Sequence, residues 1–299
     1  MDLVARINEL KKTKNAVICA HYYVADEIQQ IADYVGDSFY LAKVATKIDA
    51  DVIVFCGVKF MGESAKILNP DKIVLMPDAN ADCPMAHMAS IERIEELRRE
   101  YDDLCVVCYV NSTAELKSHS DVCVTSSNAL KIVESLPNKN IFFIPDKNLG
   151  GYVKQQVKGK NIILNDGYCP IHENISLEDA IKAKELHPNA KLIVHPECRE
   201  ELVAIADYVG STAGMIEYVK TSDASEFIVG TEVGIMYELT ANKDKKFYPI
   251  SQKQICRDMK LISLEKIVEA LETMSPQVKL DSKLMELANK PLTAMLELA

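Results

Sequence analysis

The chain has 299 residues, 48% of them hydrophobic, and a formal net charge of −10 at pH 7. This length and composition allow large buried cores, and the acidic balance, with no basic stripe to offset it, argues against a nucleic-acid partner. No stretch approaches the roughly 20 consecutive apolar residues needed to cross a bilayer, so no membrane partner is expected.

The N-terminal segment predicts a helix rather than an export signal. Residues 1–14 are charged and place Leu3, Ile7 and Leu10 on one helical face. The next apolar run is continuous, as in strands that are covered on both faces. The first unit is predicted to consist of strand 16–20, helix 28–35, helix 38–48, strand 51–58, helix 61–68 and strand 72–77.

The rest of the chain alternates strands and helices in the same way. Strands are predicted over 104–110, 121–127, 141–145 and 161–165, and then over 191–195, 206–212, 226–230 and 246–250. Two helical patterns, 261–274 and 282–299, follow the last strand. Strands that alternate with helices form parallel sheets with right-handed crossovers.

Three copies of one unit come into register when three residues at strand ends are aligned as anchors, namely His21, Tyr109 and His195. The residues twelve positions after the anchors are Asp33, Asp121 and Asp207, and those seventeen positions after them are Ser38, Ser126 and Thr212. A cysteine closes each copy: Cys83, Cys169 and Cys256. The hexapeptide IADYVG occurs twice, at 31–36 and at 205–210.

This repeat predicts an α/β protein with three similar three-layer αβα domains, whose parallel sheets surround a pseudo-threefold axis. The expected boundaries are 1–88 for the first repeat with the N-terminal helix, 89–176 for the second, 177–260 for the third, and 261–299 for C-terminal helices that pack on the repeats. Ligands of open parallel sheets bind beyond the carboxyl ends of the strands. The anchors and the recurring cysteines follow such ends, so we expect one shared central cavity.

Nine cysteines in a chain without an export signal favour metal or thiol chemistry in the cytoplasm over a disulfide framework. Several, such as Cys56, lie in apolar runs, where a free cysteine is usually a small buried hydrophobe. Cys105 and Cys108 form a C-x-x-C, but in a strand their side chains face opposite sides, which disfavours a redox pair. Cys198 has no counterpart in the other units.

The three recurring cysteines predict a shared metal site. Three thiolates could bind zinc with a water in the fourth place. They could equally hold three irons of a [4Fe–4S] cluster, whose fourth iron would be open to a substrate oxygen. The residues themselves do not separate these two sites.

Seven segments carry a resemblance that covers essentially the whole chain: AHYYVADEIQQIADYVGDS, VNSTAE, TSSNA, PDKNLG, IVHPEC, ADYVGST and GTEVG. In this order they resemble the quinolinate synthase family. The resemblance implies a [4Fe–4S] cluster that is held by Cys83, Cys169 and Cys256 and has one iron not ligated by protein. Some members carry a cysteine-rich run in the third ligand region, whereas this chain has only Cys256 there.

The same resemblance implies a transferase reaction. Iminoaspartate condenses with dihydroxyacetone phosphate to give quinolinate, with loss of phosphate and water, in NAD biosynthesis. It also implies functional coupling to the enzyme that makes iminoaspartate.

Site residues are expected at the strand ends and at the turns into helices. Ser38, Ser126 and the pair Ser211–Thr212 suit a phosphate, which binds donors at helix N-termini. Donors for the carboxylate and carbonyl oxygens of the substrates are predicted at His21, Tyr109, Asn111 and His195.

The proton transfers of the reaction need acid and base groups. Glu197 beside His195 is the first candidate, and Tyr23 and His21 come next. The other histidines show no recurrence and are predicted to be bystanders: His87, His119, His172 and His187.

Two other functions remain open from the residues. A radical cluster enzyme of the diphthamide-biosynthesis type also takes one cysteine from each of three units, although the His-Pro-Glu and Tyr-Val-Asn motifs argue against it. A non-enzymatic iron–sulfur redox sensor would need a nucleic-acid or protein interface, which the acidic charge disfavours.

Overall fold

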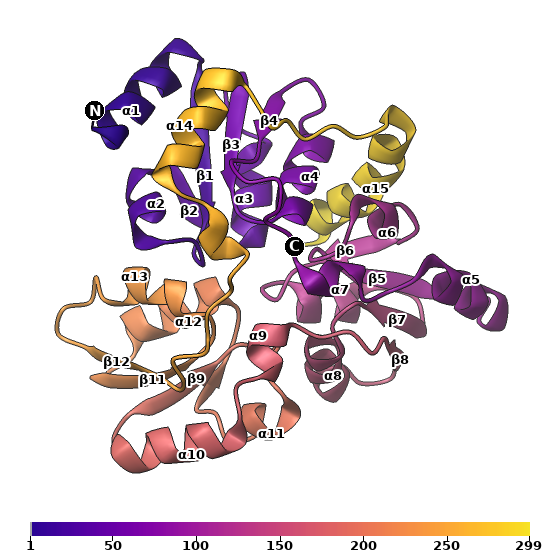
Figure 1. Ribbon diagram of the computed structural model, residues 1–299. Helices are drawn as coiled ribbons and strands as arrows, with labels where there is room; N and C mark the ends of the chain where they lie inside the picture. Colours follow the sequence, from indigo (N-terminus) through magenta and orange to yellow (C-terminus); the bar gives the residue numbers. More distant parts are fainter. Residues whose placement is uncertain (1) are drawn as a thin grey trace.

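A computed structural model describes residues 2–299 of the chain. The chain forms three α/β units, each built on a parallel sheet of four strands (Figure 1). All three sheets have the same strand order, with the second strand of the unit at one edge, followed by the first, third and fourth. The predicted α/β class with three similar αβα units is therefore confirmed.

The first unit begins with the predicted N-terminal helix. Its strands are β1 (Ala16–His21), β2 (Tyr34–Gly36), β3 (Val52–Cys56) and β4 (Ile73–Leu75). Its helices are α1 (Leu3–Thr13), α2 (Asp26–Ile31), α3 (Ser38–Ala45) and α4 (Lys59–Leu68), followed by the 3₁₀ turn η1 (Pro84–His87). Strand β3 is buried along its whole length, as its continuous apolar run predicts.

The second unit repeats this arrangement around a second sheet. Its strands are β5 (Cys105–Tyr109), β6 (Val122–Val124), β7 (Asn140–Ile144) and β8 (Asn161–Leu164). Its helices are α5 (Ile91–Glu100), α6 (Ala114–Ser118), α7 (Ala129–Ser135), α8 (Lys147–Gln156) and α9 (Pro170–Glu173).

The third unit forms the third sheet, and two further helices follow it. Its strands are β9 (Lys191–Val194), β10 (Tyr208–Val209), β11 (Glu226–Gly230) and β12 (Lys246–Pro249). Its helices are α10 (Leu177–Leu186), α11 (Glu200–Val203), α12 (Thr212–Thr221), η2 (Val233–Ile235) and α13 (Met236–Leu239). After η3 (Met259–Leu261), α14 (Leu264–Thr273) lies against α1, and α15 (Ser282–Leu298) lies against α4 and α6.

The predicted helix over 28–35 is wrong at its C-terminal half. Helix α2 ends at Ile31, and Tyr34–Gly36 forms the edge strand β2 beside β1. The same hexapeptide gives the edge strand β10 in the third unit. Its Tyr-Val pair favours a strand, and tertiary pairing overrides the helical spacing of the apolar residues.

Each unit has one aspartate, at the same position of the repeat, that binds the first strand of its sheet. Each carboxylate accepts a hydrogen bond from a backbone N–H of the first strand: Asp33 from Ile18 at 2.7 Å, Asp121 from Val106 at 2.7 Å and Asp207 from Leu192 at 2.8 Å. The recurrence of these residues thus reflects a repeated structural bond rather than chemistry at the site.

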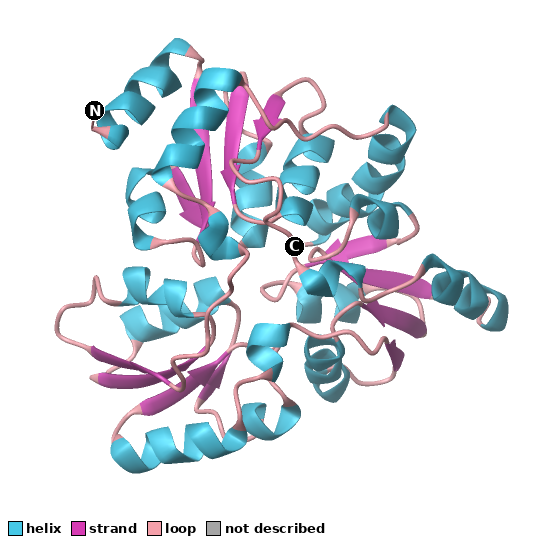
Figure 2. Cartoon of the chain, in the orientation of Figure 1, coloured by secondary structure: helices cyan, strands magenta, loops and turns pink. Residues whose placement is uncertain are grey.

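Helices cover both faces of each sheet, and the three sheets surround a common centre (Figure 2). The anchors lie at the carboxyl ends of the central strands: His21 and Tyr109 end β1 and β5, and His195 follows β9. Among residues 2–299, no helix is long and apolar enough to cross a membrane. The domain boundaries drawn from the repeat stay a prediction.

Candidate active site

A cavity of about 320 Å³ lies at the common centre and is lined by residues from all three units. This volume is in the range of small-molecule sites. Every residue that the sequence predicts for the site contributes to its lining except Ser211. The hydroxyl of Ser211 instead caps α12 and accepts a hydrogen bond from the N–H of Gly214.

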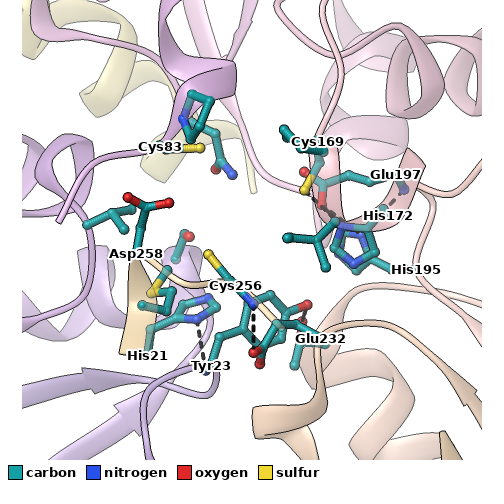
Figure 3. Close-up of a pocket in the computed structure, with 18 of the residues that line it drawn as sticks. His21, Tyr23, Cys83, Cys169, His172, His195, Glu197, Glu232, Cys256 and Asp258 are labelled. Atoms are coloured by element: carbon teal, nitrogen blue, oxygen red, sulfur yellow. Dashed lines mark hydrogen bonds and ion pairs between the residues drawn. The ribbon is translucent and has the colours of Figure 1, made fainter. Parts of the chain in front are cut away.

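The three recurring cysteines line this cavity. Cys83, Cys169 and Cys256 follow the fourth strand of their units, and their sulfur atoms point into one shared space (Figure 3). Burial raises the pKa of each thiol, to about 11 for Cys256 and well above the ordinary value for Cys169. The thiols therefore stay neutral until a cation is bound, and binding would release their protons.

One of these cysteines belongs to a compact group with His172 and Glu197. A sulfur, a ring nitrogen and a carboxylate oxygen of the three residues lie within 4.8 Å of one another, close enough to share a metal ion. Nδ1 of His172 is 2.8 Å from Oε2 of Glu197 and 3.2 Å from Sγ of Cys169. The sequence predicts His172 to be a bystander. The structure corrects this prediction, because the side chain is buried and lines the cavity.

Glu197 is almost fully buried, and only one of its carboxylate oxygens is paired. Burial raises the pKa of this group, but His172 and His195 outweigh that effect and hold its pKa below the ordinary value. Oε2 lies 2.8 Å from Nδ1 of His172 and 3.3 Å from Nδ1 of His195, whereas Oε1 has no hydrogen-bond partner among the described residues. The site thus holds an ionised carboxylate with one free basic oxygen.

The two histidine anchors have the same local geometry. In each, Nδ1 accepts a hydrogen bond from the backbone N–H two residues later, that of Tyr23 for His21 at 3.2 Å and that of Glu197 for His195 at 3.3 Å. Burial lowers the pKa of His21 to about 3 and also lowers the pKa of His195. Both rings are therefore neutral near pH 7.

A hydrogen-bonded chain joins the buried carboxylate to the first unit. Nε2 of His172 lies 2.8 Å from Oγ1 of Thr231, which lies 2.7 Å from the hydroxyl of Tyr23. The same hydroxyl is 2.8 Å from Oγ1 of Thr212. Burial raises the pKa of Tyr23 well above its ordinary value, so this phenol stays protonated. The chain links residues of all three units.

Hydroxyl groups recur on the cavity wall at the turns into helices. Ser38 is the first residue of α3, Thr212 is the first of α12, and Ser126 lies before α7. Oγ of Ser126 is 3.1 Å from Nε2 of His195. The structure thus brings together on one cavity the three hydroxyls that the register aligns.

Tyr109 and Asn111 complete the wall from the second unit. Tyr109 is 5% exposed, and burial raises its pKa well above the ordinary value, so its hydroxyl remains a donor. Oδ1 of Asn111 is buried without a partner among residues 2–299. Cys198, in contrast, is buried outside the lining, with Sγ 3.4 Å from the carbonyl oxygen of Gly230.

Some residues of the lining do not recur in all three units, so the repeat did not predict them. Asp37, Glu232, Lys253 and Arg257 contribute to the wall, and His172 has no counterpart in the other units. The available signal for His172 was its position three residues after a recurring cysteine. For Glu232 it was its position in GTEVG, one of the segments that carry the family resemblance.

Comparisons with known proteins agree along the whole chain. The model of the family described as quinolinate synthetase A protein matches residues 5–297. The quinolinate synthase of Fusobacterium nucleatum subsp. nucleatum is 53% identical to this chain over 98% of both proteins. The quinolinate synthase of Clostridioides difficile (strain 630) is 50% identical over 100% of this chain and 98% of that protein.

A third relative is similar over the same extent of the chain. The quinolinate synthase of Methanosarcina barkeri is 48% identical over 99% of this chain and 97% of that protein. These matches confirm the resemblance that the sequence motifs indicated. The chain belongs to the quinolinate synthetase A protein family.

Proposed function

We propose that this chain is a quinolinate synthase, which condenses iminoaspartate with dihydroxyacetone phosphate to quinolinate, with release of phosphate and water, in NAD biosynthesis. The family match and the names of the relatives support this activity. The observation that carries it is the meeting of three cysteines, one from each unit, on a cavity that also holds the paired Glu197.

The donor set of the cavity fits an iron–sulfur cluster. Cys83, Cys169 and Cys256 offer three sulfur ligands that share one space, and sulfur from cysteine is the usual protein ligand of [4Fe–4S] clusters. Three cysteines would leave one iron without a protein ligand. When bound, such a cluster supplies a Lewis acid that polarises a hydroxyl or carboxylate oxygen of the substrate and favours loss of water.

The hydroxyl groups of the wall are suited to the phosphate of dihydroxyacetone phosphate. Ser38, Ser126 and Thr212 would donate hydrogen bonds to its oxygens, and the helices that begin near them would add their unpaired backbone N–H groups. His21, Tyr109 and Asn111 remain for the carboxylate and carbonyl oxygens of the two substrates. Local donors are necessary because the net charge of −10 repels anions.

Glu197 is proposed as the base that moves protons between substrate atoms. Its free oxygen Oε1 takes a proton from a substrate carbon or hydroxyl, and His172, 2.8 Å from Oε2, holds the carboxylate in place. His195, neutral and 3.1 Å from Ser126, can donate a hydrogen bond from Nε2 to a substrate oxygen. Tyr23 stays protonated and therefore orients Thr212 rather than acting as a base.

The chemistry of one substrate predicts its supply. Iminoaspartate carries an imine, which water hydrolyses, so the cavity must exclude bulk water during the reaction. We propose functional coupling to the enzyme that makes iminoaspartate for the same reason. Glu197 and both histidine anchors are almost fully buried, which agrees with a water-poor site.

A second candidate is a single-ion site. Cys169, His172 and Glu197 form a group of the ligand types that zinc prefers, within 4.8 Å of one another. Such a site would use only one of the three recurring cysteines. It would leave Cys83 and Cys256 without a role on the cavity wall.

The test is an anaerobic absorption spectrum with iron and sulfide analysis of the purified chain, followed by a product assay with both substrates. A brown protein that forms quinolinate supports the proposal. A brown protein without quinolinate would favour a radical cluster enzyme, and a colourless protein that contains zinc would favour the single-ion site.

A further inference from the structure

In each unit, the segment before the recurring cysteine forms one backbone hydrogen bond with the loop that follows the third strand. A backbone N–H three residues after the end of the third strand donates to a carbonyl oxygen two residues before the cysteine. The three bonds are Lys59 to Ala81 at 2.8 Å, Lys147 to Gly167 at 2.7 Å and Val233 to Gln254 at 2.9 Å. The repeat therefore fixes the approach of each cysteine to the centre by one common backbone contact.

Two units add a buried carboxylate to this contact. Oδ2 of Asp146 accepts a hydrogen bond from the backbone N–H of Cys169 at 3.1 Å, and Oε1 of Glu232 accepts one from the N–H of Cys256 at 3.1 Å. Figure 3 shows the second bond beside the cavity. Both acidic residues lie two positions after the third strand of their units, which ends at Ile144 in β7 and at Gly230 in β11.

The first unit lacks this carboxylate. Its residue at the equivalent position, two after the end of β3, is Val58. The N–H of Cys83 donates instead to Oδ1 of its own neighbour Asp82 at 2.8 Å. Asp82 is half-exposed and also pairs with His87. The first unit therefore holds its cysteine through a local and solvated contact.

Both carboxylates of the other units are buried, with exposed fractions of 0% for Asp146 and 1% for Glu232. Burying a carboxylate is costly unless its charge is compensated. Lys260 lies 3.2 Å from Glu232. Asp146 has no ion pair with another residue of 2–299 and accepts from N–H groups, including that of Leu149 at 2.6 Å. A helix cap alone does not require a buried acidic side chain, because serine caps equally well.

We infer that Asp146 and Glu232 are positioning residues that fix the backbone of Cys169 and Cys256, so that both sulfurs stay directed into the cavity as metal ligands. Removal of a residue that hydrogen-bonds to a metal ligand and orients it typically lowers metal affinity or activity about 10- to 100-fold. This role rests on the proposed cluster.

The test compares three variants of the iron-loaded chain under anaerobic conditions. Asp146→Ser keeps a capping oxygen for α8 but cannot also reach Cys169. Glu232→Gln keeps the shape but has one acceptor oxygen in place of two, so it cannot accept from both Gly234 and Cys256. Glu63→Gln is the matched control, because Glu63 is a buried carboxylate that accepts a backbone N–H, from Ala114 at 3.0 Å, away from the cysteines. The readouts are the rate of iron release to a chelator, the reduction potential of the cluster and the urea midpoint of unfolding.

Asp146→Ser and Glu232→Gln are expected to release iron about tenfold faster or more and to shift the reduction potential of the cluster, because a sulfur ligand is less firmly oriented. Glu63→Gln should match the parent chain in both readouts. Unchanged release and potential in iron-loaded variants, or equal acceleration in the control, overturn the positioning role alone. A parent chain that binds no iron overturns the proposed cluster and this role together. If one variant unfolds, the other decides.

Discussion

The hydroxyl of Tyr23, in the first unit, lies 2.7 Å from Oγ1 of Thr231, which follows β11 in the third unit. Thr231 is fully buried and also contacts Nε2 of His172 at 2.8 Å. This threonine thus connects the ring that pairs with Glu197 to the phenol that orients Thr212. The connection joins residues of different units and fixes the position of side chains on both sides of the cavity.

Thr231→Val should break this connection without changing the volume of the side chain. We expect turnover to fall by about tenfold or more, because His172 and Tyr23 both lose the partner that orients them. The free energy of unfolding should fall by about 1–2 kcal/mol, since two buried polar groups lose a hydrogen bond. The exposed Thr240 provides the control variant Thr240→Val. Turnover equal to that of the parent chain would mean that the connection is only structural.

Glu197→Gln should leave iron content unchanged and reduce turnover by about 100-fold or more. An amide keeps the shape of the side chain but cannot accept a proton at the position of Oε1. Steady-state kinetics with parallel iron analysis measure both effects. Glu201→Gln, an exposed change on α11, is the control. Full activity of the Glu197 variant would remove this residue from acid and base catalysis.

Replacement of the recurring cysteines should abolish assembly of the cluster. Cys83→Ala, Cys169→Ala and Cys256→Ala are each expected to yield protein with little or no cluster iron, because a missing ligand leaves an iron exposed. Cys56→Ala, within the buried strand β3, should retain the iron content of the parent chain. Iron and sulfide analysis after anaerobic reconstitution gives the comparison. Equal losses in all four variants would contradict the ligand assignment.

The recurrence of residues at strand ends predicted the convergence of the site, and its physical basis is the geometry of parallel sheets. Because the carboxyl ends of parallel strands share one edge, His21 and His195 had to lie at equivalent places. The three units turn the carboxyl ends of their strands towards one centre. Cys83 and Cys256 therefore line one cavity, although 172 residues lie between them in the chain.

What the sequence did not predict depends on contacts that occur only once. His172 and Thr231 acquire their importance from each other and from Glu197, across distances in the chain that no local pattern encodes. The edge strand β2 was also missed, because IADYV satisfies the helical spacing as well as the preference for a strand. The carboxylate of Asp33, just before β2, accepts a hydrogen bond from the N–H of Ile18 in β1 and holds the segment beside that strand.

The aspartate that recurs at the sheet edge should give a pH-dependent contribution to stability. Burial raises the pKa of Asp207, but the N–H of Leu192 and the ammonium groups of Lys191 and Lys184 outweigh it and hold the pKa below the ordinary value. The unfolded value is about 3.9. The stabilisation is therefore fully present above about pH 4 and is lost as the pH falls through the folded pKa.

Asp207→Asn should accordingly lower the free energy of unfolding at pH 7 by about 0.5–1 kcal/mol, a modest amount because solvent screens this carboxylate. The difference from the parent chain should shrink towards zero as the pH falls to about 2. Urea unfolding across this range measures it. Asp244→Asn, at an exposed carboxylate, should show no comparable effect. A difference that stays constant with pH would mean that the charge of Asp207 is not its cause.

Two cations on the loop after β12 should attract the anionic substrates. Lys253 and Arg257 are exposed and contribute to the cavity lining, whereas the chain as a whole carries a net charge of −10. Local positive charge at a cavity raises the rate at which anions enter, and salt screens it. Lys253→Gln combined with Arg257→Gln should lower kcat/KM by about tenfold at low ionic strength and leave kcat nearly unchanged.

Kinetics at rising salt concentration test this role, because the difference between the double variant and the parent chain should shrink as the screening length falls. Lys182→Gln on α10 removes an exposed cation far from the cavity lining and should change neither parameter. A drop in kcat as large as the drop in kcat/KM, and persistent at high salt, would mean that Lys253 or Arg257 contacts the reacting atoms. In that case the two cations would contribute to binding of the transition state rather than to entry of the substrates.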